Sequence, residues 1–101
     1  MVNNLAELER RIVFVGGHSS LQAKLKKEFD FTFISADVMN FDVTKIKNAK
    51  YVLIFTQYMN HPQYNKVMNN LADKKQLRII KGAHNLKILI RKIYNCIQMN
   101  K

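Results

Sequence analysis

This sequence has a single cysteine, Cys96, and no long apolar run. One cysteine cannot form an intrachain disulfide, so a disulfide-stapled fold is excluded and a reducing compartment is expected. No apolar run approaches the ~18 residues that a membrane-spanning helix needs. The acidic opening residues differ from the basic start of a signal peptide. The sequence therefore predicts a soluble, cytoplasmic protein with no membrane partner.

Motifs for known reactions are missing as well. No Gly-Lys-[Ser/Thr] follows Gly16-Gly17, so this glycine turn is not a P-loop, and the Gly-x-Ser-x-Gly frame of a nucleophile elbow is absent. The histidine spacings match no metal motif, and helix capping accounts for Ser19 and Ser20 better than a nucleophilic role does. Cys96 fits core packing. The sequence names no reaction, metal or cofactor, which favours a non-enzymatic protein.

The chain is long enough for one domain, and its charge is unevenly spread. Its 101 residues are 48% hydrophobic, enough to bury a core, so residues 1–101 are predicted to form a single domain. Residues 1–42 contain five Lys or Arg and six Asp or Glu, whereas residues 43–101 contain twelve basic residues and only one acid. This asymmetry indicates an acidic partner for the second half; the alternative is a lysine-rich solvated surface.

Strand and helix patterns alternate along the chain. Runs of apolar, β-branched or aromatic residues predict strands over residues 11–15, 31–35, 51–55 and 77–80. Helical spacing of apolar residues predicts helices over residues 19–28 and 43–49, from near residue 60, and over residues 86–97. Ser19 and Gln22 have capping-box spacing, and Gln63 lies three residues after the expected cap Asn60.

This alternation is typical of a small three-layer α/β domain of the Rossmann-like or flavodoxin-like kind. We expect about four parallel strands in the order 2-1-3-4, with helices on both faces of the sheet. A four-stranded sheet has two exposed edges, and edges attract partners. A homodimer is therefore expected, with Ile88 and Leu89 widening the apolar stripe of the last helix.

Ligands of such sheets bind where loops leave the carboxyl ends of the strands. Gly16-Gly17 ends the first strand and lets the backbone approach a ligand, and Ser19-Ser20 open a helix whose N–H groups favour an anion. The order 2-1-3-4 brings the end of the third strand beside this turn. We therefore predict an anionic small-molecule or nucleic-acid ligand, bound by Gly16, Gly17, His18, Ser19, Ser20, Thr56, Tyr58, Asn60, His61, Lys81, Gly82, His84 and Asn85.

The three histidines, His18, His61 and His84, each follow a predicted strand end. A neutral imidazole can donate to a phosphate or bind a metal, and His18 has the most favourable position for either. His61 also fits an exposed first-turn residue, and His84 an ordinary turn residue. Tyr58 is a further candidate because its ring can stack on a base or line the crevice.

The last helix suggests a second hypothesis, in which the basic second half binds nucleic acid. Lys87, Arg91 and Lys92 are its most prominent cations. Binding through them would weaken steeply with salt, because each phosphate contact releases counterions.

Two short motifs resemble the small bacterial family called domain of unknown function 2325. Its members show a strand ending in Gly-Gly followed by Arg or His, matched by residues 15–18, and a polar residue and His at a helix start, matched by Asn60-His61. The resemblance runs from Arg11 onward and departs at residues 35–41. It implies a compact Rossmann-like domain with no common reaction. A cyanobacterial relative is associated with haem, which would make His61 or His84 a candidate ligand.

Overall fold

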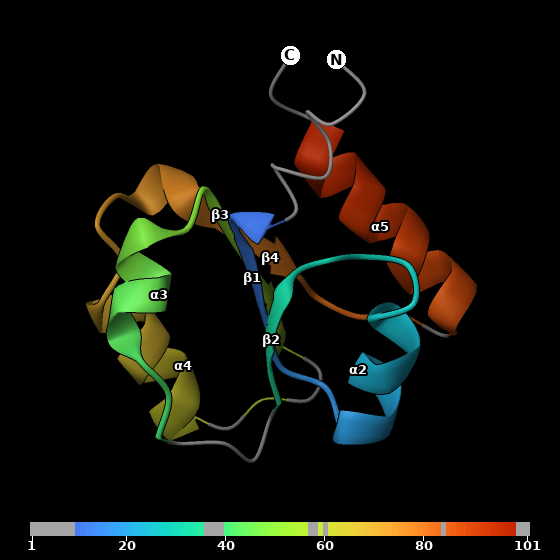
Figure 1. The fold of residues 1–101 in the computed structure, drawn as a ribbon, viewed down its shortest axis with the longest axis horizontal. Helices are drawn as coiled ribbons and strands as arrows, with labels where there is room; N and C mark the ends of the chain where they lie inside the picture. The colour runs from blue at the N-terminus through green and yellow to red at the C-terminus, as the bar shows by residue number, and fades with distance from the viewer. Residues whose placement is uncertain (1–9, 36–39, 57–58, 60, 84, 99–101) are drawn as a thin grey trace.

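The computed structural model describes residues 10–35, 40–56, 59, 61–83 and 85–98. Strands and helices alternate along this part of the chain as predicted (Figure 1). The elements are, in chain order, β1 (Ile12–Val15), α2 (Ser19–Leu25), β2 (Thr32–Ile34), α3 (Val43–Asn48), β3 (Tyr51–Phe55), α4 (His61–Asn69), the 3-10 helix η2 (Lys74–Gln76), β4 (Leu77–Ile80) and α5 (Leu86–Gln98).

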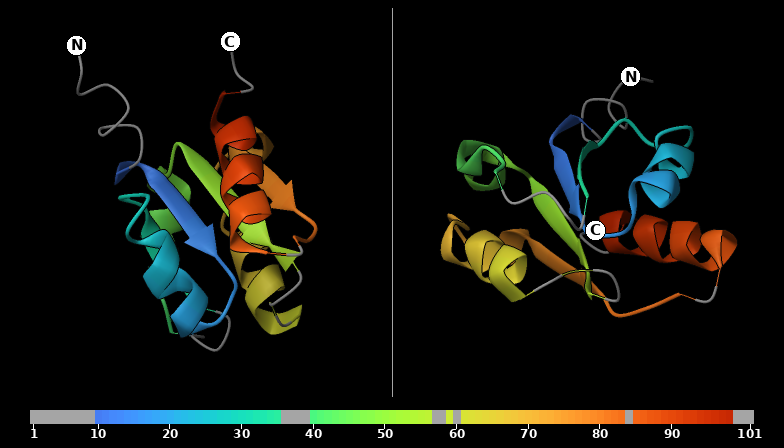
Figure 2. Two further views of the ribbon diagram at one scale, coloured as in Figure 1. Left: turned by 90° about the vertical axis from the view of Figure 1, so that its right-hand side faces the viewer. Right: turned by 90° about the horizontal axis from the view of Figure 1, so that it is seen from below.

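The four strands form one parallel sheet in the order β2-β1-β3-β4. Helices α2 and α5 cover one face of the sheet, and α3 and α4 cover the other, as Figure 1 and the view from below in Figure 2 both show. The described chain is thus a small three-layer α/β domain of the Rossmann-like or flavodoxin-like kind, and the predicted strand order is confirmed.

The two central strands, β1 and β3, are buried along their whole length. Ile12 and Phe14 point to the side of α2 and α5, whereas Val13 and Val15 point to the side of α3 and α4. Because side chains alternate along a strand, each central strand contributes to two separate cores. This double burial explains why residues 12–15 and 51–55 are apolar at every position.

Several predicted helix details need correction. Helix α2 ends at Leu25 rather than near residue 28, because residues 26–28 form a turn. The 3-10 helix η2 was not predicted; Asp73 caps it, with the Gln76 side chain completing a capping box. Leu89, expected to widen the outer apolar stripe of α5, is 1% exposed and lies in the core. The homodimer stays a prediction.

The buried polar side chains among the described residues are all glutamines, and each donates to loop carbonyl oxygens. The Gln22 amide donates to Gly16 (2.7 Å) and the Gln63 amide to Ser35 (2.8 Å). The Gln76 amide donates to Ile46 (2.9 Å) and Ala49 (2.7 Å). The capping box predicted for Ser19 and Gln22 is therefore wrong, because the N-cap is His18 and the Gln22 amide links α2 to the turn after β1. The Gln63 amide likewise links α4 to the loop after β2, and its expected cap Asn60 lies outside the described residues.

None of the helices within the described residues combines the length and apolarity of a membrane span.

Gly17 is the position where the fold depends most directly on glycine. Its φ is +81°, and an added Cβ would lie 3.0 Å from the Leu21 side chain. We expect Gly17→Ala to lower the free energy of unfolding by about 1–3 kcal/mol, because an L residue at positive φ is strained. Urea denaturation followed by circular dichroism measures this.

The matched control for this change is Gly82→Ala, because Gly82 does not have a positive φ. We expect a loss below about 1 kcal/mol there. Equal losses at both glycines would contradict the argument from backbone conformation.

Candidate functional site

The turn between β1 and α2 is packed tightly against the sheet. Gly16 and Gly17 both have positive φ, 111° and 81°, and both are buried. The Gly16 N–H donates to the Ile34 carbonyl oxygen (2.9 Å), and the Gly16 carbonyl accepts from the Gln22 amide (2.7 Å). Both backbone polar groups of Gly16 therefore bind within the protein. The exposed part of this turn begins at His18.

His18, Ser19 and Ser20 are exposed at the start of α2. His18 occupies the N-cap position, and no side chain caps this helix end by a hydrogen bond. The predicted cap Ser19 is instead the first residue of the helix. These three residues face solvent at the carboxyl edge of the sheet, as predicted.

His18 and His61 follow the neighbouring strands β1 and β3 and line different cavities. His18 lines a cavity of about 210 Å³ between the first turns of α2 and α5, together with Asn85 and Leu86. His61 lines another of about 240 Å³, with Thr56 and Tyr64. These two cavities have no lining residue in common among the described residues. Tyr58, Asn60 and His84 lie outside the described residues.

The predicted residues of the β4–α5 connection have structural partners. The Asn85 side chain accepts from the Ile88 N–H (3.0 Å), which confirms Asn85 as the cap of α5. The Gly82 carbonyl accepts from the Lys92 ammonium (2.5 Å). Lys81 is exposed beside them. Lys87 and Arg91 are exposed one turn apart on α5, as the nucleic-acid hypothesis requires.

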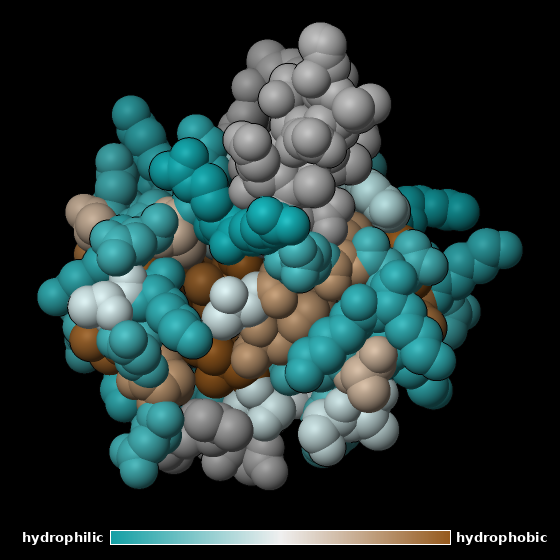
Figure 3. Space-filling view, viewed as in Figure 1, coloured by the Kyte–Doolittle hydropathy of each residue, from teal (hydrophilic) through white to brown (hydrophobic). Residues whose placement is uncertain are grey.

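A larger cavity, of about 460 Å³, wraps the outer edge of β2 at the carboxyl side of the sheet. Figure 3 shows apolar surface in the hollow between β2 and α3, with hydrophilic residues around it. Of the predicted site residues that the structure describes, only Ser19 lines this cavity. The others are Gln22, Lys26, Thr32, Phe33, Ile34, Ser35, Asn40, Phe41, Asp42 and Lys45.

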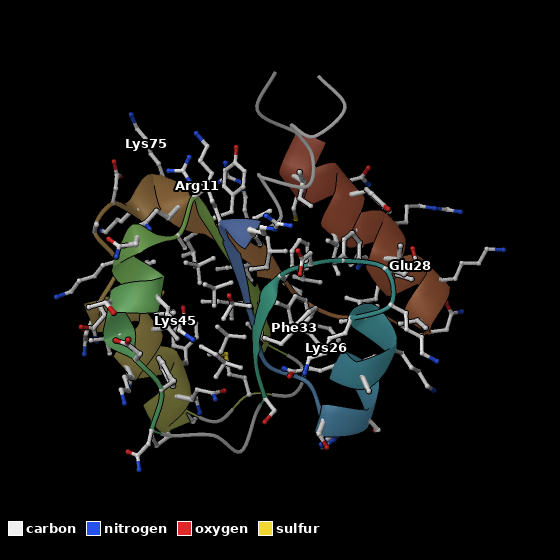
Figure 4. All side chains as sticks on the ribbon, viewed as in Figure 1. Arg11, Lys26, Glu28, Phe33, Lys45 and Lys75 are labelled. Carbon is white, nitrogen blue, oxygen red and sulfur yellow. The ribbon has the colours of Figure 1, made fainter. Side chains whose placement is uncertain are left out.

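This β2-edge cavity combines cations with aromatic rings. The Lys26 ammonium lies 6.0 Å from the centre of the Phe33 ring, and the Lys66 ammonium lies 4.5 Å from that of Phe41. In Figure 4, Lys26 lies beside Phe33 on the α2 side of β2, and Lys45 lies on the α3 side. Both rings are half-buried, so each keeps an accessible surface.

Asp42 provides the negative charge of the β2-edge cavity. Its carboxylate accepts from the backbone N–H (3.0 Å) and the hydroxyl (2.5 Å) of Thr44 at the start of α3. These hydrogen bonds, with a smaller effect of the Lys45 charge, lower the pKa of Asp42. Asp42 is therefore ionised at neutral pH and offsets Lys45, which leaves Lys26 as the better position for an anion.

The sequence contains little local signal for this cavity. Lys26, Phe33 and Lys45 belong to three different elements and meet only because β2 is an edge strand. The composition of residues 31–35, rich in aromatics, indicated a strand but not which of its rings stays accessible.

Cys96 is the remaining nucleophilic group among the described residues. Burial raises the pKa of the half-buried Cys96 thiol, although the charge of Arg78 opposes this effect. Among the described residues, no three His, Cys, Asp or Glu side chains come together as a metal site. Comparison with protein-family models, curated proteins and solved structures finds no significant match. The resemblance to domain of unknown function 2325 therefore stays a prediction.

The Gln22 side chain is expected to hold the β1–α2 turn in place. Gln22→Leu keeps the side-chain size but removes the donor to the Gly16 carbonyl. We expect it to cost about 1–3 kcal/mol of unfolding free energy, because a buried acceptor loses its partner. Chemical denaturation measures this loss. Lys24→Gln, on the exposed side of the same helix, should change stability by less than about 0.5 kcal/mol; similar effects of both changes would refute the role of Gln22.

Proposed function

We propose that this protein is a non-enzymatic binding module for an anionic ligand, with a nucleotide as the best fit, at the carboxyl edge of its parallel sheet. The β2-edge cavity supports this proposal. Its volume of about 460 Å³ lies within the ~300–1,000 Å³ of typical small-molecule sites. The cavities beside His18 and His61, at about 210 and 240 Å³, are below that range.

The chemistry of the cavity matches the parts of a nucleotide. Lys26 and the Ser19 hydroxyl come from the two ends of α2, and together they offer charge and a hydrogen bond to a phosphate. The half-buried rings of Phe33 and Phe41 offer apolar surface to a base. Asn40 and Ser35 supply polar groups between them. The juxtaposition of Lys26 with the Phe33 ring is the observation that carries the proposal.

The residues predicted in the turn between β1 and α2 are also included in this proposal. His18, Ser19 and Ser20 follow one another at the start of α2, and only Ser19 lines the β2-edge cavity. A ligand bound at Ser19 can extend along this exposed turn towards His18. The effect of replacing His18 therefore distinguishes a ligand in the β2-edge cavity from a ligand in the smaller cavity between α2 and α5, which His18 lines.

Lys26→Gln should weaken nucleotide binding about three- to tenfold, because it removes the least offset cation of the cavity while keeping the side-chain length. Titration of the full chain with AMP, ATP and inorganic phosphate, followed by calorimetry and thermal shift, measures this change.

The matched control for Lys26→Gln is Lys27→Gln, because Lys27 is exposed next to it but does not line the cavity. Equal effects of the two changes, or no binding by the unmodified protein, would overturn the proposal. A loss of binding caused by His18→Ala but not by Lys26→Gln would assign the ligand to the cavity between α2 and α5.

Nucleic-acid binding through α5 is the second candidate function. The observation that favours it is the exposed pair Lys87 and Arg91, one turn apart on a helix that contains no acidic residue. Cations in this arrangement can contact phosphates along a nucleic-acid backbone.

Lys87→Gln and Arg91→Gln should each lower the salt dependence of oligonucleotide binding by about 0.7–0.9 in the slope of log K against log salt. Fluorescence anisotropy at several salt concentrations measures the slopes. Lys47→Gln, on α3 at the opposite face of the sheet, is the control. Oligonucleotide binding that does not change with salt concentration, or a slope unchanged by all three substitutions, would exclude α5 as the nucleic-acid surface.

A further inference from the structure

A second basic cavity lies where the parallel strands begin, opposite the edge formed by their carboxyl ends. It has a volume of about 350 Å³ and is lined by Lys50, Tyr51, Asp73, Lys75, Gln76 and Arg78. Tyr51 and Leu77 begin β3 and β4, so this amino-edge cavity opens where these parallel strands start. It shares no lining residue with the β2-edge cavity.

The guanidinium of Arg78 is held in place at the wall of this cavity. Its Nη1 donates to the carbonyl oxygens of Lys75 (2.7 Å) and Leu77 (2.8 Å). Its central carbon lies 4.8 Å from the centre of the Tyr51 ring, which is 5% exposed. A planar cation fixed by two carbonyls and an aromatic face is oriented before any ligand arrives.

Two further cations line the same cavity. The Lys50 ammonium lies 6.0 Å from the centre of the Tyr51 ring, so a single ring has two positive charges beside it. Lys75 adds a third charge from η2, and Figure 4 shows its side chain at the same end of the molecule as Arg11. Like charges that line one cavity repel one another, and an anion bound between them would offset this repulsion.

Among the described residues that line the cavity, Asp73 is the only carboxylate, and it has a structural role. Asp73 Oδ1 accepts from the Lys75 N–H (2.9 Å), and the Asp73 N–H donates to the Gln76 side chain (2.8 Å). These contacts hold Asp73 in the capping box of η2. The described lining residues thus include three cations and one carboxylate that is already hydrogen-bonded, an excess of positive charge.

We propose that the amino-edge cavity is a phosphate-binding site, in which Lys50, Lys75 and Arg78 contact a tetrahedral oxyanion. A guanidinium matches the spacing of phosphate oxygens, and the two ammonium groups supply further donors and charge. A phosphate ester and the backbone of a nucleic acid offer the same chemical group. The site is independent of the proposed nucleotide site, because the two cavities lie at opposite edges of the sheet.

The test is a titration of the full-length protein with inorganic phosphate, followed by NMR shifts of the backbone amides of residues 75–78. We expect saturable shifts there, and at least threefold weaker binding for Lys50→Gln and for Lys75→Gln. Lys74→Gln is the matched control, because Lys74 is exposed beside Lys75 but does not line the cavity. Shifts that do not saturate, or equal weakening by Lys74→Gln and Lys75→Gln, would overturn the proposal.

Two further titrations distinguish the sources of the phosphate. If the source is a nucleic-acid backbone, a short single strand binds more tightly than inorganic phosphate, and Lys75→Gln lowers its salt slope by about 0.7. If the source is a free ester, a sugar phosphate binds more tightly and the oligonucleotide shows no dependence on Lys75. Lys26→Gln should leave all these affinities unchanged, so this site and the nucleotide site can fail separately.

Discussion

The burial of β1 and β3 on both faces is the constraint on which the rest of the structure depends. Phe14 and Leu53 pack towards α2 and α5, whereas Val13 and Val52 pack towards α3 and α4. A strand with two apolar faces is stable only between two layers, so the chain has to send helices to both sides. That requirement sets the parallel order and gathers every strand end at one of two edges. Both proposed binding cavities lie at these edges.

The backbone of such a sheet also needs partners where the chain leaves it, and three glutamines provide them. Gln22 and Gln63 each bind a carbonyl beyond the end of a strand, and Gln76 binds the end of α3. An amide is long enough to reach a loop carbonyl and carries no charge that burial would penalise. The loops around the candidate site are thus fixed by buried amides, of which Gln22 also lines the β2-edge cavity.

The sequence predicted the fold better than the site, for a physical reason. Periodicity is a local property, so it predicted the four strands; their order was expected from the fold class, and the Asn85 cap from its residue type. The carbonyl partners of the Gln22 and Gln76 amides lie outside their own helices, and sequence spacing does not show such partners. Phe55 and Thr56 are adjacent in sequence, yet Phe55 lines a cavity with His18 and Thr56 lines another with His61, a division that local sequence patterns do not show.

The open edge strands of the sheet favour association between copies of the protein, whereas its net positive charge opposes it. β2 and β4 are edge strands, and β4 exposes Ile79 at 43%, a feature that invites pairing with another chain. A formal net charge of +10 makes two copies repel each other before such edges can meet. This barrier has a range of about 10 Å at 0.1 M salt and about 3 Å at 1 M. The colloidal stability of the protein therefore depends on ionic strength. A bound polyanion would neutralise the positive charge and so remove the repulsion between copies.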